Sequence, residues 1–278
     1  MTTRILYVNN FCNQNCIFCL GLPKKLQNFK KLIKEADELV ISGGEPALSK
    51  DIFEILDFCK SNKKIKKIEF QSNGAIFFYR NFLNKILNLK IVNEFNINFS
   101  SHNKELDKEI TQANLFEYKV KGIQNLVDAE QNVRLTFVIN KLNYGMMLDY
   151  MKFINSKWKD IKIQFSFLQF EGKVMKNLSL VPLYSELRPY LLKALGFAKE
   201  NNMKVAVENI PMCIFPEYKE FSLDFFKKPS NRKSFYPKKT IKKCSRCVLK
   251  ANCFGIPIDY LKIFGSREIN SQLKEVQS

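Results

Sequence analysis

The sequence lacks long hydrophobic runs, has a single histidine and is poor in acidic residues. Its longest uncharged run, residues 5–23, contains several Asn, Gln and Cys residues, so we do not interpret it as a membrane span. The N-terminus leads directly into a strand-like segment without the layout of a signal peptide, so we expect a cytoplasmic protein. The lone histidine, His102, gives no convincing Ser–His–Asp or Cys–His pair and is more typical of a turn.

The composition is that of a folded protein. The chain has 278 residues, of which 46% are hydrophobic, enough for one large domain or one domain with a small appendage. The 45 Lys and Arg against 27 Asp and Glu give a net charge of +18, which indicates a binding partner only where it clusters. Without an export signal, the eight cysteines are better explained as metal ligands than as disulfides.

Short apolar runs alternate with amphipathic stretches over the first two-thirds of the chain. The expected strands are residues 5–8, 39–42, 65–71, 95–100, 133–140 and 161–167. Such repeated βα units predict an α/β fold with a parallel sheet, either a partial (β/α)6 barrel or an open doubly wound sheet. In both cases ligands bind at the carboxyl ends of the strands.

The pattern changes near residue 210. Residues 187–201 predict a further helix and residues 205–207 a seventh strand. Residues 211–243 then contain four prolines, many aromatics and many lysines. We therefore expect a core domain over residues 1–210 and a C-terminal segment over residues 211–278.

Three cysteines follow the first predicted strand closely: Cys12, Cys16 and Cys19. Three thiolates within eight residues can hold three corners of one metal centre, and a fourth local ligand is missing. A [4Fe–4S] cluster held by three cysteines keeps one iron open for a substrate or cofactor. A zinc knuckle or buried thiols are the alternative.

This C-x3-C-x2-C loop, with Phe18 before its last cysteine, resembles the signature of radical S-adenosylmethionine (radical SAM) enzymes. Further motifs follow at successive strand ends and are together more specific than any one of them. They are the stretches at residues 43–46 (GGEP), 72–74 (SNG), 95–103 and 138–143, so the resemblance covers residues 4–170.

The resemblance implies a [4Fe–4S] cluster on the three cysteines and S-adenosylmethionine bound beside it. The cofactor contacts that it implies are Phe18, Gly43, Gly44, Glu45, Asn73, Asn98, Ser100, Arg134 and Asn140. Paired glycines permit close backbone approach to a ligand, and a carboxylate accepts from an ammonium group.

Each contact has a structural alternative. The GGEP stretch can be an ordinary strand-to-helix turn, and Asn73 a turn residue. Asn98 and Ser100 share one side of their strand by the period of two, although the family usually has Ser where this chain has Asn98. Arg134 can pair with the cofactor carboxylate or lie at the rim of the sheet. Cys59, on an apolar helix face, is expected in the core.

A second group of cysteines lies in the C-terminal segment: Cys213, Cys244, Cys247 and Cys253. Four cysteines satisfy a closed site for either zinc or a second [4Fe–4S] cluster. The stretch around Cys253 also resembles the auxiliary-cluster segments of radical SAM enzymes, of the SPASM and shorter twitch types.

The positive charge concentrates around this second group. Residues 225–258 contain ten basic residues, no Asp or Glu, and the interleaved aromatics Phe225, Phe226, Phe235 and Tyr236. A solvated lysine-rich loop is the simplest interpretation. The alternatives are a docking surface for an acidic electron donor such as flavodoxin or ferredoxin, or for an anionic substrate such as RNA.

The resemblance therefore predicts an enzyme that reductively cleaves S-adenosylmethionine to a 5′-deoxyadenosyl radical, which abstracts hydrogen from a peptide, a protein or a small molecule. The first strand begins near residue 4, so we expect no preceding leader-binding domain, which weakens the peptide option. Modification of RNA is an alternative. A non-catalytic iron–sulfur or zinc protein that binds nucleic acid is the alternative from another class.

Overall fold

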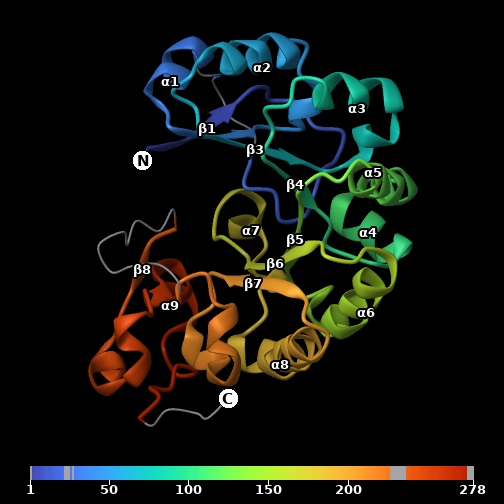
Figure 1. Ribbon diagram of the computed structural model, residues 1–278. Helices are drawn as coiled ribbons and strands as arrows, with labels where there is room; N and C mark the ends of the chain where they lie inside the picture. Colours follow the sequence, from blue (N-terminus) through green and yellow to red (C-terminus); the bar gives the residue numbers. More distant parts are fainter. Residues whose placement is uncertain (1, 22–25, 27, 226–235, 274–278) are drawn as a thin grey trace. The chain divides into compact units, whose positions relative to one another are not determined.

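The computed structural model describes residues 2–21, 26, 28–225 and 236–273 (Figure 1). Seven strands of this part form one parallel sheet in chain order, which confirms the expected α/β fold and its seventh strand. The strands are β1 (Thr3–Tyr7), β2 (Glu38–Ser42), β3 (Lys67–Ser72), β4 (Glu94–Asn98), β5 (Val133–Ile139), β6 (Lys162–Phe167) and β7 (Lys204–Glu208).

Helices connect the strands, as crossovers between parallel neighbours require. They are α1 (Phe29–Glu35), α2 (Ile52–Ser61), α3 (Arg80–Leu87), α4 (Lys104–Thr111), α5 (Phe116–Asp128), α6 (Met147–Lys157), α7 (Gly172–Lys176) and α8 (Tyr184–Glu200). Short 3-10 turns extend several connections, among them η1 (Pro46–Leu48), η2 (Ala75–Phe78), η3 (Tyr144–Met146), η4 (Leu178–Leu180), η5 (Met212–Ile214) and η6 (Pro216–Phe221). No helix within the described ranges has the length and apolar character needed to cross a bilayer.

The C-terminal segment has little regular structure. A two-stranded antiparallel sheet pairs β8 (Lys238–Lys239) with β9 (Ile256–Pro257). Between these strands lie two short 3-10 turns, η8 (Lys242–Arg246) and η9 (Val248–Ala251), and α9 (Ile258–Phe264) follows β9. The predicted boundary near residue 210 stays a prediction.

The chain divides into two compact units. The first comprises Met1–Ile17 and Gly21–Thr136, and the second comprises Phe18–Leu20 and Phe137–Ser278. The division falls within β5 and within the first cysteine loop, so Cys12 and Cys16 belong to the first unit and Cys19 to the second.

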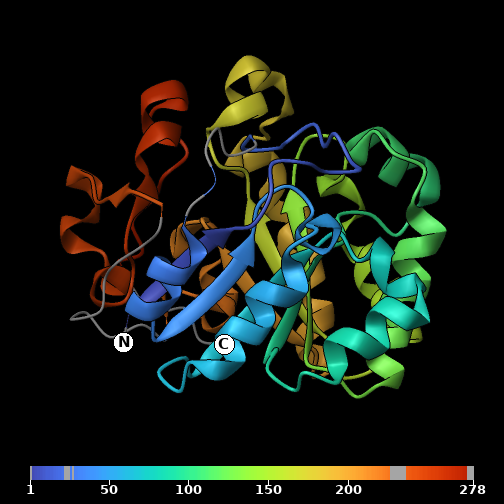
Figure 2. The same cartoon turned by 90° about the horizontal axis from the view of Figure 1, so that it is seen from above.

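The core of the first unit forms because alternate residues of its strands are apolar. Ile68 and Phe70 of β3, and Phe95 and Ile97 of β4, are each no more than 2% exposed. Phe77 of η2 packs edge-on against Phe95, with ring centroids 5.4 Å apart. Helices α1 and α2 lie side by side over this unit (Figure 2).

The opposite face of the same strands is polar. Its half-buried side chains hydrogen-bond from strand to strand, through Ser42, Gln71, Glu69, Asn96 and Thr136. Parallel register places these residues on one side, since Gln71 of β3 is opposite Asn96 of β4. The strands therefore have one face for the core and one for polar groups.

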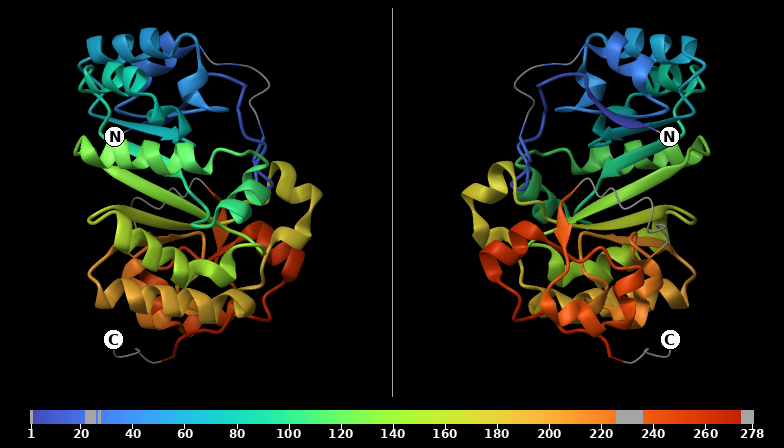
Figure 3. Two further views of the ribbon diagram at one scale, coloured as in Figure 1. Left: turned by 90° about the vertical axis from the view of Figure 1, so that its right-hand side faces the viewer. Right: turned by 90° about the vertical axis from the view of Figure 1, so that its left-hand side faces the viewer.

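The second unit is built in the same way. Helices α6 and α8 pack side by side (Figure 3) and cover the apolar residues of β6 and β7. Phe165 of β6 contacts Phe137, with ring centroids 5.4 Å apart. On the other side, Gln164 and Ser166 of β6 both donate to Glu208 of β7.

Glu268 ties the C-terminal segment to α8. Its carboxylate accepts from the backbone N–H groups of Tyr184 (3.3 Å) and Ser185 (2.9 Å), the first two residues of α8, and from the hydroxyls of Ser185 and Tyr260. These are N–H groups that a helix cannot satisfy internally, and a carboxylate there also opposes the positive end of the helix dipole.

Replacing this anchor should destabilise the second unit. We expect Glu268→Ala to lower the free energy of unfolding by about 1–3 kcal/mol, because it leaves the Ser185 N–H without its acceptor and the Tyr184 N–H with only the Tyr260 hydroxyl at 3.1 Å. Urea titration followed by circular dichroism measures the change. Glu200→Ala, at the exposed opposite end of α8, is the control and should change stability by less than about 0.5 kcal/mol. Equal effects of the two substitutions would refute the anchoring role.

Candidate active site

The first cysteine loop is held in place by backbone hydrogen bonds on both sides of Cys16. The N–H groups of Asn15 and Ile17 donate to the carbonyls of Thr111 and Ile110, each at 2.9 Å. These carbonyls end α4, where a helix leaves its last acceptors unsatisfied. Within the loop, the Cys16 thiol donates to Gln14 Oε1 at 3.4 Å. The loop therefore has a defined shape on the first unit.

The two glycines of the GGEP stretch lie against the residues that precede Cys12. A Cβ atom on Gly44 would lie 1.9 Å from the Phe11 carbonyl oxygen, so no other residue fits there without a backbone shift. The Gly44 N–H donates to Asn9 Oδ1 at 3.0 Å, and the Glu45 N–H donates to the Phe11 carbonyl at 2.7 Å. The glycines therefore permit a close approach of the backbone to the residues after β1, and their contact with the cofactor stays a prediction.

Glu45, which follows β2, is 2% exposed. Its backbone is bonded to the chain after β1, and its carboxylate is bonded to the end of β3. Its carboxylate accepts from the N–H groups of Asn73 (2.7 Å) and Ala47 (3.1 Å) and from the hydroxyl of Ser72 (2.8 Å). Burial raises the pKa of the Glu45 carboxyl to about 7, against the opposing effect of these three donors. Its assignment to the cofactor ammonium stays a prediction.

The first unit contains other polar residues that the sequence predicted as cofactor contacts, and they form two groups. Asn73 donates from Nδ2 to Asn13 Oδ1 at 2.7 Å, which ties the end of β3 to the loop between Cys12 and Cys16. Ser100 donates to Asn98 Oδ1 at 3.4 Å, so these two side chains are neighbours at the end of β4. Both groups lie at the carboxyl ends of β3 and β4, where ligands bind in parallel sheets.

Arg134 lies elsewhere in the first unit. It is the second residue of β5, toward the amino end of the strand, and its guanidinium pairs with Glu69 (2.7 Å) and Glu94 (3.7 Å). These carboxylates neutralise its charge within the protein. The contacts favour the rim interpretation over a pair with the cofactor carboxylate.

Asn140, just beyond β5 in the second unit, is fully buried and shapes its own turn. Its Nδ2 donates to the Val138 carbonyl at 3.1 Å, and its Oδ1 accepts from the Leu142 N–H at 3.0 Å. Both polar atoms of the side chain thus have local partners, and a cofactor contact stays a prediction.

The remaining part of the cysteine loop belongs to the second unit. The Cys19 carbonyl accepts from the Lys173 N–H at 3.0 Å, and Gly172, with a φ of +56°, lies directly against the Cys19 carbonyl oxygen. Phe18 is 8% exposed. Helix α7 therefore fixes the backbone of Cys19.

A buried ion pair supports α4, and sequence patterns did not reveal it. Lys119 of α5 donates to Asp107 of α4 at 2.6 Å, and both side chains are fully buried. The ammonium also lies 5.4 Å from the centroid of the Phe99 ring. The only signal in the sequence is a charged residue on the apolar side of each helix.

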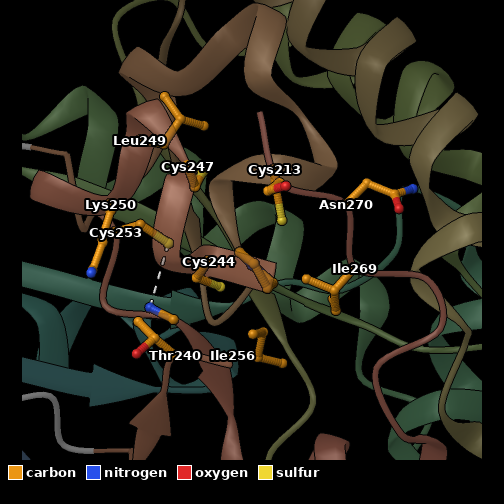
Figure 4. Close-up of a pocket in the computed structure, with 13 residues that line it drawn as sticks. Cys213, Thr240, Cys244, Cys247, Leu249, Lys250, Cys253, Ile256, Ile269 and Asn270 are labelled. Carbon is orange, nitrogen blue, oxygen red and sulfur yellow. Dashed lines mark hydrogen bonds between the residues drawn. The ribbon is translucent and has the colours of Figure 1, made fainter. Parts of the chain in front are cut away.

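The four C-terminal cysteines surround one cavity (Figure 4). Burial and the three neighbouring thiols raise the pKa of Cys213 to about 12. Burial also raises the pKa of Cys253, although the Gly255 N–H donates to its sulfur at 3.4 Å. A positive φ of +97° at Gly255 makes this turn possible. The structure thus brings together Cys213, Cys244, Cys247 and Cys253.

In the described part of the chain, no three Cys, His, Asp or Glu side chains meet the geometry of a single-ion site. The four C-terminal cysteines line one cavity. Cys59 is 3% exposed on α2, as expected for a core residue.

The family model of the Radical SAM superfamily matches residues 6–154, more than half of the chain. The chain belongs to the radical SAM superfamily. It is therefore an enzyme that uses a [4Fe–4S] cluster and S-adenosylmethionine, and the interpretation as a non-catalytic nucleic-acid-binding protein is wrong. Three cysteines within eight residues of the sequence suit such a cluster.

Two curated relatives are similar in sequence to this radical SAM chain. A probable GTP 3′,8-cyclase of Methanocaldococcus jannaschii is 26% identical over 197 residues, 66% of this chain and 60% of that protein. The molybdenum cofactor biosynthesis protein moc-5 of Caenorhabditis elegans is 26% identical over 60% of this chain and 30% of that protein. The chain thus spans 60% or less of the length of these two relatives.

Solved structures confirm the partial barrel fold. Streptococcus suis SuiB, bound to the precursor peptide SuiA, aligns with a TM-score of 0.61 at 16% identity, covering 78% of this chain and 51% of that chain. At this identity the likeness establishes the fold alone.

The raised pKa of Glu45 predicts a pH dependence of stability. Its folded-state pKa of about 7 exceeds the ordinary 4.5, so its stabilising contribution is complete below pH 4.5 and is lost as the pH rises through 7. We expect the free energy of unfolding to fall by about 3 kcal/mol over this window and to level off above it.

Glu45→Gln should remove that slope, while Glu54→Gln, which alters a carboxylate that is 61% exposed, should retain it. Urea titrations between pH 4.5 and pH 8 measure the three proteins. The same slope in wild type and Glu45→Gln would show that this carboxyl titrates near its ordinary value.

Proposed function

We propose that this enzyme cleaves S-adenosylmethionine reductively and uses the resulting 5′-deoxyadenosyl radical to abstract hydrogen from a small polar molecule. The observation that carries the proposal is the loop with Cys12 and Cys16, bonded to α4, to the GGEP stretch and to Asn73. The bound cluster and cofactor supply the radical chemistry.

The chain's own residues orient and enclose these groups. Cys12, Cys16 and Cys19 hold the cluster and leave one iron without a protein ligand. Gly43 and Gly44 keep the backbone beside the loop free of side chains, and Glu45 holds three strand ends together. Asn98 and Ser100 provide hydrogen-bonding groups at the end of β4 for the cofactor.

The polar side chains on one face of the strands support the proposal that the substrate is polar. In the first unit Gln71, Asn96 and Thr136 are half-buried on this face, and in the second unit Gln164, Ser166 and Glu208 form a similar group. Buried polar groups bind a ligand that replaces their hydrogen bonds and reject one that cannot. One of the two relatives is named a probable GTP 3′,8-cyclase, which makes GTP the first substrate to test.

For the second site we propose a [4Fe–4S] cluster. The four thiols line one cavity and supply the four ligands that such a cluster needs, as the resemblance to auxiliary-cluster segments implies; zinc, which also takes four cysteines, is the alternative. Reduced thiols are typical of a cytoplasmic protein, and a cytoplasmic location with a flavodoxin- or ferredoxin-type electron donor belongs to this proposal.

Anaerobic reconstitution tests the main proposal. With dithionite and S-adenosylmethionine, the wild-type enzyme should form 5′-deoxyadenosine, and Cys16→Ala should reduce its yield at least about 100-fold because the cluster loses a ligand. Cys59→Ala, which alters a core thiol, is the matched control and should retain activity. Wild-type protein with a full iron content and no 5′-deoxyadenosine would refute the proposal. Deuterium transfer into 5′-deoxyadenosine from labelled GTP tests the substrate.

Metal analysis tests the second site. Cys253→Ala should lower the iron content from about eight to about four per chain if this site binds a cubane cluster. The first cluster should remain, so S-adenosylmethionine should still alter its electron paramagnetic resonance spectrum. An unchanged iron content together with a loss of zinc would establish the zinc alternative.

A further inference from the structure

Exposed cations surround the second cysteine site. Lys242 and Arg246 lie two positions on either side of Cys244 in η8, and both are exposed. Lys250 of η9 lines the cavity itself (Figure 4), and Lys239 adjoins Thr240, another lining residue. We call these four residues the cationic rim. Four other basic residues of this stretch, Lys227, Lys228, Arg232 and Lys233, lie outside the described residues.

The carboxylates that flank this stretch in the sequence are already engaged elsewhere. Asp224 accepts from Lys238 at 3.1 Å, with both side chains nearly buried. Asp259 pairs with Lys262 at 3.0 Å, and Glu268 caps α8. No residue of the cationic rim pairs with a carboxylate of the described residues. The rim is therefore a local excess of positive charge at the protein surface.

The neighbouring side chains favour an acidic protein over RNA. Single-stranded RNA binds through aromatic platforms, but Tyr236 is 3% exposed and its hydroxyl accepts from the Phe170 N–H and donates to Asp259. Phe225 is half-buried, and Phe226 and Phe235 lie outside the described residues. Val248, next to Cys247, is 42% exposed and offers the apolar contact that a protein interface uses inside a charged border.

We propose that the cationic rim is the docking surface for an acidic electron-carrier protein. Complementary charge steers such a partner and fixes its orientation, and the cavity with the four cysteines lies within the docking surface. The inference rests on the proposed function in one respect, since an electron carrier has a reason to dock here only if the cysteines hold a redox group.

A charge-reversal variant of the reconstituted full chain tests the proposal. Lys239→Glu, Lys242→Glu and Arg246→Glu together should weaken the binding of a bacterial flavodoxin, or of a [2Fe–2S] ferredoxin, at least about tenfold. The control reverses three exposed lysines of the first unit, Lys60, Lys63 and Lys121, and should change affinity less than about twofold. Calorimetric titration at low and physiological salt measures the dissociation constants.

Several results would overturn the proposal. The first is that the wild-type protein binds neither carrier. The second is an equal loss of affinity in the two triple variants. The third is that the wild type and the control variant bind an oligouridine RNA and the rim variant does not. Cleavage of S-adenosylmethionine with dithionite bypasses the carrier and should be unchanged in the rim variant. If the wild type binds the carrier but yields no 5′-deoxyadenosine with dithionite, the proposed function fails and the docking surface stands.

Discussion

The buried carboxylate of Glu45 is the interaction on which the N-terminal half of the site depends. It receives hydrogen bonds from the residues that follow β3, while the backbone beside it is bonded to Asn9 and Phe11 after β1. Parallel strands have no hairpin to join their ends, and here the Glu45 carboxylate and the backbone beside it connect their loops. Burying a carboxylate is costly and is tolerated because all its close partners are donors. The bonds to Asn9 and Phe11 hold the chain that leads directly into Cys12.

The separation of apolar and polar faces explains why the strands suit a ligand. Helices cover the apolar face, which accounts for the full burial of Phe70 and Phe95. Glu69, Asn96 and Thr136 on the other face satisfy one another, so the face is ordered before a ligand arrives. Such preorganisation lowers the entropic cost of binding.

The sequence predicted the fold and the loop of Cys12, because period-two strands and strand-end motifs are local signals. It did not predict the partners of Arg134, since Glu69 lies 65 positions away and meets it only through sheet register. Asn140 and Glu45 follow the same principle. The family resemblance implied ligand contacts for both, and the structure adds that each side chain also satisfies the backbone of its own turn or its neighbours, which no local signal in the sequence indicates.

The ion pair of Asp107 and Lys119 extends the argument to the other side of the cysteine loop. Asp107 Oδ2 has no hydrogen-bond partner among the described residues, so the pair is not optimised for stability. It does fix α4 against α5, and the final carbonyls of α4 bind the N–H groups on either side of Cys16. An apolar replacement of similar volume can stabilise a protein core, but it lacks the directional bond that fixes one register of two helices. The pair is therefore better explained by the position it gives to Cys16 than by the stability it adds.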